Sequence, residues 1–316
     1  MSDLAVLVTC PPMQRTAADW KGRFDALGIE VRLPPVVQQL SPEELVALLP
    51  EVDGMIAGDD QLTADVLDRA GERLRVISKW GIGLDGIDLA AAERLGIRVT
   101  NTPDTFGEEV ADVAIGYLIL LARQLHRIDH SVRHGEWAKP QGVSLAGRNL
   151  GIVGLGSIGR AVAGRGLAMG MRVIGREILP SSAEHATALG VEVVDLETVI
   201  ADSDVISLHC PLTEQNRHMI NAERLGQMRP GAFIINTARG PLIDEAALVE
   251  ALRSGHLAGA ALDVFEEEPL PSESPLKDLE QVLLGSHNAS NTREAVARVN
   301  ELAIDNVIRG MDEVTR

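Results

Sequence analysis

Three side chains in the last third of the sequence form a set that could move a proton beside a bound anion. They are Arg239 in INTARGPLIDEAAL, Glu268 in AALDVFEEEPLP and His287 in LLGSHNASNTREA. Imidazole titrates near neutral pH, so His287 is the candidate acid–base group. A carboxylate such as Glu268 would orient the imidazole ring and favour its charged form. Arg239 could grip a carboxylate through two parallel hydrogen bonds and polarise a neighbouring oxygen.

Each of these segments directly follows an apolar run that is predicted to be a β-strand. The carboxyl ends of parallel strands share one edge of a sheet, and ligands bind at that edge. The three groups are therefore expected to meet there. Simpler alternatives remain open. His287 could be a structural histidine, Arg239 could cap a helix or pair with Asp244, and the run Glu266–Glu268 could be a solvated loop.

A glycine-rich turn adds a candidate nucleotide site. Gly154, Gly156 and Gly159 form G-x-G-x-x-G between an apolar strand and a helical stretch. The first glycine permits a tight turn, the second lets the backbone approach a pyrophosphate, and the third lets helix and strand pack closely. The start of the helix, at Ser157 and Ile158, would present unpaired N–H groups to the phosphates. The turn predicts a bound dinucleotide.

An acidic residue follows the second strand of this nucleotide-binding pattern. Glu177 lies 177 − 159 = 18 residues beyond Gly159, near the spacing at which a carboxylate binds the ribose hydroxyls. A carboxylate there repels a 2′-phosphate and favours NAD, whereas the adjacent Arg176 could receive the phosphate of NADP. NAD is expected, with NADP as the alternative.

The chain ahead of the glycine turn reads as an α/β domain of its own. Ser41 to Glu44 form a capping box with proline at the first helical position, and the alanine-rich helix Leu89–Leu95 stops at Gly96. Alternating strands and helices indicate βαβ units and a parallel sheet. The predicted strands are Leu4–Thr9, Glu30–Leu33, Gly54–Ala57, Arg75–Trp80 and Ile97–Thr102.

A second α/β domain is predicted from Asn149 onwards. A long helix precedes it, with Thr105 and Glu108 as its start signal. The lone helical stretch Thr292–Met311 needs a surface to pack on, and the first domain is the candidate, which would split that domain in the sequence. The predicted strands are Leu150–Val153, Met171–Arg176, Val191–Val194, Val205–His209, Ala232–Asn236, Ala260–Val264 and Val282–Leu284.

Composition excludes several classes of protein. The formal net charge of −17 disfavours binding to nucleic acid or to anionic membranes. Two cysteines without a CxxC pattern indicate neither a disulfide framework nor a zinc finger. His126, His130 and His134 recur every four residues on the predicted long helix, and a polar helix face is favoured over a metal site there. The N-terminus reads as a strand and not as a signal peptide, so the cytoplasm is the expected location.

The motifs together resemble the D-isomer-specific 2-hydroxyacid dehydrogenases, and among them the phosphoglycerate dehydrogenase-like members. The resemblance covers nearly the whole chain. Besides the glycine turn and the three segments above, it includes KWGIGLDGIDLAAAERLGIRVTNTP at 79–103 and DVISLHCPLTEQNRHMI at 204–220. It implies two doubly wound α/β domains, a Rossmann cofactor domain (102–287) inserted into a split flavodoxin-like substrate domain (1–101 and 288–316).

The resemblance also assigns roles to residues. Arg239, Glu268 and His287 fall on the family's catalytic positions, with Arg239 also binding substrate. Asp263 matches the contact to the nicotinamide carboxamide. The cofactor is further lined by segments that contain Cys210, Thr237 and Ala238. The substrate carboxylate would be held by the backbone of Gly81, Ile82 and Gly83, and Lys79 matches a position that contacts substrate.

The implied reaction moves a hydride between nicotinamide and C2 of a small D-2-hydroxy acid or its 2-oxo form. The leading candidate substrates are of the 3-phosphoglycerate type or of the hydroxypyruvate and glyoxylate type. A homodimer is also expected from the resemblance. Two alternatives remain. One is a dinucleotide-sensing, corepressor-like binding protein, and the other is a dehydrogenase of formate or phosphite.

Overall fold

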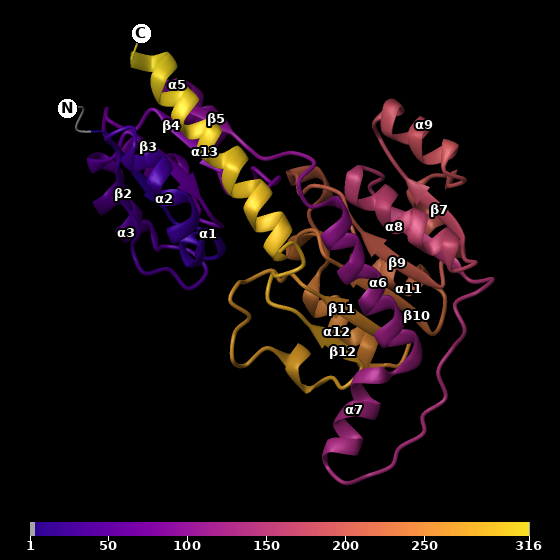
Figure 1. Ribbon diagram of the computed structural model, residues 1–316. Helices are drawn as coiled ribbons and strands as arrows, with labels where there is room; N and C mark the ends of the chain where they lie inside the picture. The colour runs from indigo at the N-terminus through magenta and orange to yellow at the C-terminus, as the bar shows by residue number, and fades with distance from the viewer. Residues whose placement is uncertain (1–3, 316) are drawn as a thin grey trace. The chain divides into compact units, whose positions relative to one another are not determined.

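The computed structural model describes residues 4–315, which fold into two compact α/β units. The first unit runs to Thr105 and resumes at Asn291, and the second comprises Phe106–Ser290 (Figure 1). The second unit is thus inserted into the first, as expected. Both crossings lie a few residues beyond those expected from the sequence. Residues 1–3 and 316, assigned above to the substrate domain, lie outside the described residues.

The first unit is built on a five-stranded parallel sheet of order β2-β1-β3-β4-β5, the order found in flavodoxin-like folds. Its strands are β1 (Ala5–Val8), β2 (Glu30–Arg32), β3 (Gly54–Ala57), β4 (Val76–Lys79) and β5 (Arg98–Thr100). Its helices are α1 (Pro11–Arg15), α2 (Ala17–Asp25), α3 (Pro42–Leu48), α4 (Ala64–Asp68), α5 (Leu89–Arg94) and α13 (Arg293–Thr315), with a 3-10 turn η1 (Leu49–Glu51).

Helix α13 returns from the end of the chain to pack on β3 and β4 (Figure 1). Two glycines permit the close approach. A Cβ at Gly54 would lie 2.8 Å from a methyl carbon of Val307, and one at Gly310 would lie 2.4 Å from a methyl carbon of Val76. The predicted return segment is confirmed, and the amphipathic helix completes the core of the first unit.

The second unit holds a seven-stranded parallel sheet of order β12-β11-β10-β9-β6-β7-β8, which is the Rossmann order with one added strand. Its strands are β6 (Asn149–Val153), β7 (Arg172–Arg176), β8 (Glu192–Val193), β9 (Val205–Leu208), β10 (Ala232–Asn236), β11 (Leu257–Leu262) and β12 (Val282–Leu284). Its helices are α6 (Gly107–Arg123), α7 (Leu125–Arg133), α8 (Ser157–Ala168), α9 (Pro180–Ala188), α10 (Leu196–Asp202), α11 (Ala222–Gln227) and α12 (Glu245–Arg253). Three 3-10 turns are η2 (Glu214–Asn216), η3 (Gly240–Leu242) and η4 (Pro275–Asp278).

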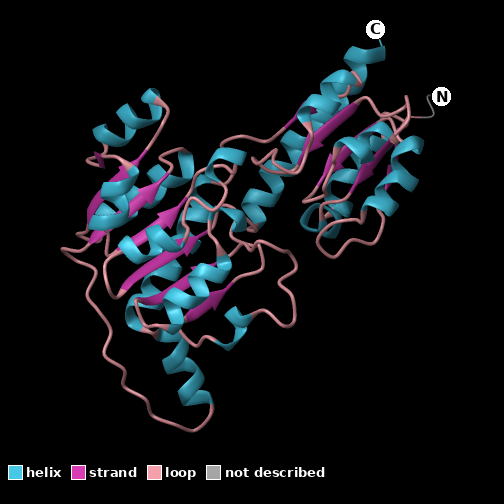
Figure 2. Cartoon of the chain, turned by 180° about the vertical axis from the view of Figure 1, so that it is seen from behind, coloured by secondary structure: helices cyan, strands magenta, loops and turns pink. Residues whose placement is uncertain are grey.

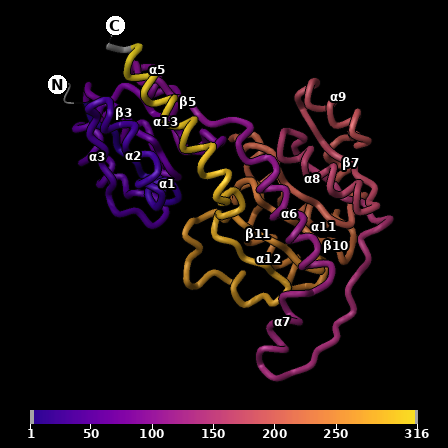
Figure 3. Tube along the Cα trace, viewed as in Figure 1, coloured from indigo at the N-terminus to yellow at the C-terminus, as the bar shows by residue number. Residues whose placement is uncertain are grey.

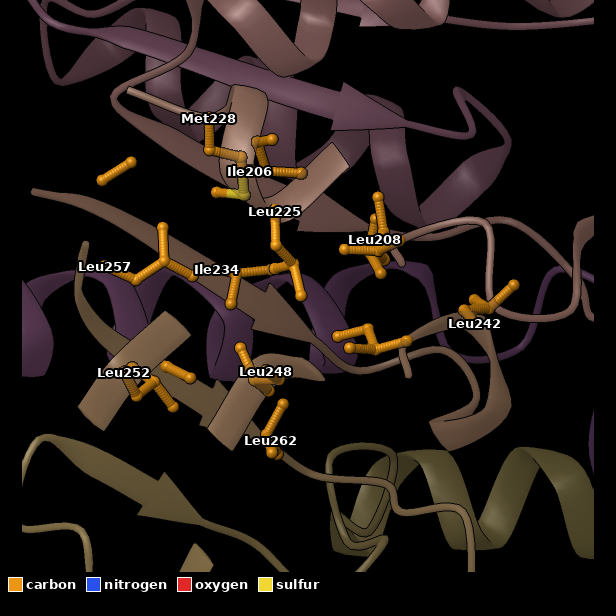
Figure 4. Packing of buried hydrophobic residues seen from close by; sticks show 14 of the residues in the cluster. Ile206, Leu208, Leu225, Met228, Ile234, Leu242, Leu248, Leu252, Leu257 and Leu262 are labelled. Carbon is orange, nitrogen blue, oxygen red and sulfur yellow. The ribbon is translucent and has the colours of Figure 1, made fainter. Parts of the chain in front are cut away.

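Helices cover both faces of each sheet (Figure 2), which is why the central strands are apolar on both sides. On one face of the second sheet, Ile206, Leu208 and Ile234 interlock with Leu248 and Leu252 (Figure 4). On the other face, α6 and α8 contribute a separate buried cluster. Burial on two faces makes the strand ends rigid supports for the loops that follow them.

The predicted long helix is wrong in two respects. Its N-cap is Phe106 and not Thr105, because the Thr105 hydroxyl donates to the carbonyl of Thr102 instead of capping the helix that begins at Gly107. It ends at Arg123, since Gln124 adopts a left-handed φ of 52° and a separate helix, α7, follows.

The three spaced histidines therefore belong to α7 and its C-cap. Among residues 4–315, no group of three or more His, Cys, Asp or Glu side chains could hold a metal ion. Figure 3 traces the extended segment 134–148 that leads from α7 to β6. No helix in the described part of the chain is both long and apolar enough to cross a membrane.

Candidate active site

The glycine turn joins β6 to α8 and leaves open space at Gly156, beside the N-terminus of the helix. Gly154 has a φ of +92°, and a Cβ there would lie 2.7 Å from the carbonyl carbon of His209. A Cβ at Gly159 would lie 2.0 Å from the Gly154 oxygen, so both positions require glycine. By contrast, a Cβ at Gly156 would meet nothing within 4 Å. Gly156 is the N-cap of α8 and no side chain caps that helix, so its N-terminus suits a phosphate.

Glu177 directly follows β7 and turns back toward the glycine turn. One carboxylate oxygen accepts a hydrogen bond from Leu155 N at 2.7 Å. The other accepts from Ile178 N at 2.7 Å and Leu179 N at 2.9 Å. These backbone donors hold the carboxylate at the edge where a ribose would lie. Arg176 donates to the Glu177 carbonyl and lines an open hollow with residues 193–197.

The loop after β10 carries Arg239 and is shaped by Asn236, which is fully buried. The Asn236 side chain accepts from Ala238 N at 3.0 Å and donates to the Arg239 carbonyl at 2.8 Å. An Arg239 guanidinium nitrogen donates to the Ala238 carbonyl at 2.7 Å. A Cβ at Gly240 would lie 1.8 Å from the carbonyl carbon of Phe265. The Arg239 loop is therefore pressed against the turn that carries Glu268.

Glu268 and His287 form a hydrogen-bonded pair. His287 Nδ1 lies 2.7 Å from one carboxylate oxygen of Glu268, and the two side chains are 25% and 21% exposed. The other Glu268 oxygen accepts from Phe265 N at 2.9 Å. Since an ionised carboxylate only accepts, the contact places the proton of a neutral ring on Nδ1 and leaves Nε2 as the basic nitrogen. This is the arrangement of an oriented general base.

Asp263, at the end of β11, holds the loop that carries His287. Its carboxylate accepts from Asn288 N at 3.2 Å and from Ala289 N at 2.8 Å. Its backbone carbonyl accepts from His287 N at 2.6 Å. Tyr117 on α6 places its hydroxyl 3.5 Å from the same carboxylate, and desolvation raises the pKa of that phenol. Asp263 was expected to contact nicotinamide, and its loop contacts were not foreseen.

The segment after β9 lies against the glycine turn. His209 is partly buried, with Ser207 Oγ 2.8 Å from Nε2 and Thr237 Oγ1 3.4 Å from Nδ1. Desolvation lowers the pKa of His209 to about 3, so the ring is neutral at physiological pH. Desolvation likewise raises the pKa of Cys210 to about 11, which keeps its thiol protonated and unreactive.

The loop that follows β4 in the first unit supplies backbone donors. Gly81 N donates to Thr102 Oγ1 at 3.0 Å, and its carbonyl accepts from Thr102 N at 3.0 Å. Within the described chain, the N–H groups of Ile82 and Gly83 make no hydrogen bond. Of the three residues expected to hold the substrate carboxylate, these two offer amides for it.

Lys79, the last residue of β4, is 7% exposed and its ammonium already has partners. It donates to the Gly58 carbonyl and to Asp59 Oδ1, the latter at 3.1 Å. Asp60 lies nearby, 2% exposed. Burial raises the pKa of Asp60, while Leu40 N, Thr9 and the charge of Lys79 oppose that rise. This pairing could not be predicted from the sequence, because Asp59 and Lys79 lie at the ends of different strands.

The described residues fit a dinucleotide. The turn leaves space at Gly156, the helix N-terminus is uncapped, and Glu177 lies beside the turn. The structure brings together Glu268 with His287, and Asp263 with the loop of His287. It also shows residues that sequence reasoning missed, namely Asn236, Tyr117, His209, Thr102 and Asp59. Asn236 had a visible signal, an amide at the end of the apolar strand AFIIN.

The chain matches proteins of known kind over most of its length. The family model described as D-isomer specific 2-hydroxyacid dehydrogenase, NAD binding domain, matches residues 115–289. A hydroxypyruvate reductase of Thermotoga maritima is 42% identical over 277 residues, which cover 86% of this chain and 89% of the relative. A D-3-phosphoglycerate dehydrogenase of Methanocaldococcus jannaschii is 40% identical over 90% of this chain and 56% of the longer relative.

A solved structure shares the whole fold. The crystal structure of a glyoxylate reductase from Paecilomyes thermophila superposes with a TM-score of 0.85 at 30% identity, covering 98% of this chain and 96% of the other. Shared strand order, a family match over more than half of the chain and close relatives all agree. The protein therefore belongs to the D-isomer-specific 2-hydroxyacid dehydrogenase family and is an enzyme that uses NAD.

Proposed function

We propose that this enzyme interconverts a small D-2-hydroxy acid and its 2-oxo acid, with substrates of the hydroxypyruvate and glyoxylate or 3-phosphoglycerate type. The observation that carries the proposal is the 2.7 Å contact between His287 and Glu268 at the edge of the Rossmann sheet. Relatives named hydroxypyruvate reductase and D-3-phosphoglycerate dehydrogenase support the substrate class.

In this proposal His287 acts as the acid–base group. During oxidation of a hydroxy acid, its Nε2 takes the proton of the C2 hydroxyl, and during reduction it returns that proton to the C2 oxygen. Glu268 accepts from Nδ1, orients the ring and stabilises the imidazolium that forms. Bound NAD supplies the redox chemistry at C2.

Arg239 is proposed to bind the substrate carboxylate and polarise the C2 oxygen. The amides of Ile82 and Gly83 would hold the carboxylate as well. The turn built by Asn236 fixes the backbone on both sides of Arg239, so little conformational freedom is lost when the anion binds.

Replacing the base tests the proposal. We expect His287→Ala to lower kcat for reduction of hydroxypyruvate and glyoxylate by about 10²–10⁴, while NADH still binds, as measured by fluorescence titration. His185→Ala, on the exposed surface of α9, is the matched control and should change neither value. Rates near those of the unmodified enzyme in His287→Ala would remove His287 from the chemistry.

A further inference from the structure

A cluster of charged side chains lies at the carboxyl edge of the first sheet, and it contains more carboxylates than ammonium groups. Lys79 is its cation, and Asp59 and Asp60 follow β3, the strand that pairs with β4. The Lys79 side chain is 8% exposed, whereas that of Asp59 is 38% exposed. Gln38 Nε2 donates to Asp59 Oδ2 at 2.9 Å and fixes the carboxylate from its other side. Solvent therefore meets the carboxylate of Asp59 before it meets the ammonium.

Asp60 adds a second carboxylate behind the pair. Its oxygens accept from Leu40 N at 3.0 Å, from Gly58 N at 3.1 Å and from the Thr9 hydroxyl. The backbone of Gly58 contacts both charged groups. Its carbonyl accepts from the Lys79 ammonium, and its N–H donates to the Asp60 carboxylate. The Lys79 ammonium is therefore bound by residues of its own unit.

This cluster adjoins the loop proposed to hold the substrate carboxylate. A Cβ at Gly81 would lie 3.6 Å from Lys79 Cε, so the lysine side chain runs directly beside Gly81. Ile82 and Gly83, whose amides are available, follow immediately. A 2-oxo acid anchored on those amides would bring the group on its C3 close to the cluster. This placement of the substrate rests on the proposed function.

We propose that Asp59 is a specificity-determining residue, which neutralises Lys79 so that the enzyme selects 2-oxo acids with an uncharged C3 substituent over phosphorylated ones. A phosphate monoester carries about −1.5 to −2 charges at pH 7. A free lysine would attract that charge, but a paired lysine behind a carboxylate offers little attraction and Asp59 adds repulsion. Hydroxypyruvate and glyoxylate bring no such charge.

The test compares hydroxypyruvate with 3-phosphohydroxypyruvate in the intact NADH-dependent enzyme at low salt. We expect the unmodified enzyme to favour hydroxypyruvate in kcat/KM by at least about 10²-fold, and Asp59→Asn to shift that ratio toward the phosphorylated acid by about tenfold or more. The double variant Asp59→Asn with Lys79→Met should lose the shift, because the released cation is gone. Asp65→Asn removes the same charge from an exposed side chain of α4 and should leave the ratio unchanged.

Binding gives a second readout that does not need turnover. Calorimetric titration of the NADH complex, which cannot oxidise a hydroxy acid, with D-glycerate and with 3-phospho-D-glycerate should show the same shift in the ratio of dissociation constants, and Asp59→Ser serves if the asparagine variant does not fold. An unmodified enzyme that prefers the phosphorylated acid, or an Asp59→Asn ratio equal to that of the unmodified enzyme, would overturn the assignment of Asp59. Absence of turnover on both acids together with the binding shift would instead overturn the proposed reaction and keep the role of Asp59.

Discussion

The backbone of His287 adopts a φ of +52°, a left-handed conformation that is uncommon outside glycine. Asp263 accepts hydrogen bonds from three successive amides, those of His287, Asn288 and Ala289. Surroundings that over-determine such a conformation are typical of functional sites. The imidazole is thus aimed by its backbone as well as by Glu268.

The sequence pattern identified the acid–base pair but not its supports. Glu268 and His287 could be paired because both follow predicted strands of one parallel sheet, and the contact is present. Whether they act in catalysis stays a prediction. The partners of Lys79 could not be foreseen, since an isolated lysine at a strand end carries no signal of which neighbouring loop will meet it. The backbone amides that donate hydrogen bonds to the Glu177 carboxylate could not be predicted for the same reason.

His209 makes the stability of the second unit depend on pH. Desolvation lowers the pKa of His209 to about 3 from the usual 6.5, so the unfolded chain binds a proton that the folded chain refuses. The free energy of unfolding should therefore fall as pH falls from 6.5 toward 3, by at most about 1.4 kcal/mol per pH unit from this residue.

Denaturant titrations at several pH values between about 7 and 4.5 measure this dependence. His209→Gln should be less stable overall, because it disturbs the contacts to Ser207 and Thr237, yet its stability should decline less steeply with acid. His185→Gln, at an exposed position, should keep the original slope. Equal slopes in all three proteins would show that His209 titrates normally.

Among the elements, those with strong local signals were predicted well and those set by tertiary contacts were not. The capping box at Ser41 is present, with Glu44 N donating to the serine hydroxyl at 3.2 Å. The similar signal at Thr105 failed because its hydroxyl bonds Thr102 instead. The break at Gln124 was invisible, since a left-handed glutamine has no signature in the sequence. Short helices α1 and α4 were missed for want of periodicity.

The close contact between η3 and the turn after β11 predicts that only glycine is tolerated at position 240. Gly240→Ala would force a methyl group into the backbone of Phe265, where 1.8 Å separates the two carbons. We expect a loss of several kcal/mol in stability, about 3 or more, as the two loops separate. Thermal unfolding and kcat should both fall.

Gly164→Ala is the control for this substitution. Gly164 lies within α8 on an exposed face, and a Cβ there meets nothing within 4 Å. Alanine should stabilise the helix by about 0.5–1 kcal/mol. A Gly240→Ala protein that melts like the unmodified one would mean that the loops have room to move apart.

At the scale of the whole molecule, each unit has its own apolar core, and a parallel sheet in both could be inferred from the alternation of elements. The order of the strands followed only from the resemblance to the family. The split of the first unit was predictable because a lone terminal helix had no other partner. The places where the chain crosses between units were predicted a few residues too early, since no linker-like composition marks them.

Separate cores predict that damage to one unit spares the other. Val307 on α13 is fully buried against Gly54, so Val307→Asp should destabilise the first unit by about 3–5 kcal/mol. Trp20 and Trp80 are buried in that unit while Trp137 is 76% exposed, so tryptophan fluorescence should report early melting. NADH binding by the second unit should persist above the temperature of that transition.

Val37→Asp provides the comparison, because Val37 is 87% exposed in the same unit and should tolerate the charge. Coincident loss of fluorescence and NADH binding in Val307→Asp would show that the two units unfold as one cooperative block.

The position of α13 at the far end of the chain also sets an order of events during synthesis. A growing polypeptide acquires all of Phe106–Ser290 before Arg293–Thr315 leaves the ribosome. Until then β3 and β4 lack the helix that covers them. The nascent N-terminal segment therefore exposes apolar surface to which chaperones can bind. The inserted Rossmann unit has its full set of strands and can close first. A chain released from the ribosome just short of residue 293 would hold every strand of the Rossmann unit and would still lack the helix that covers β3 and β4.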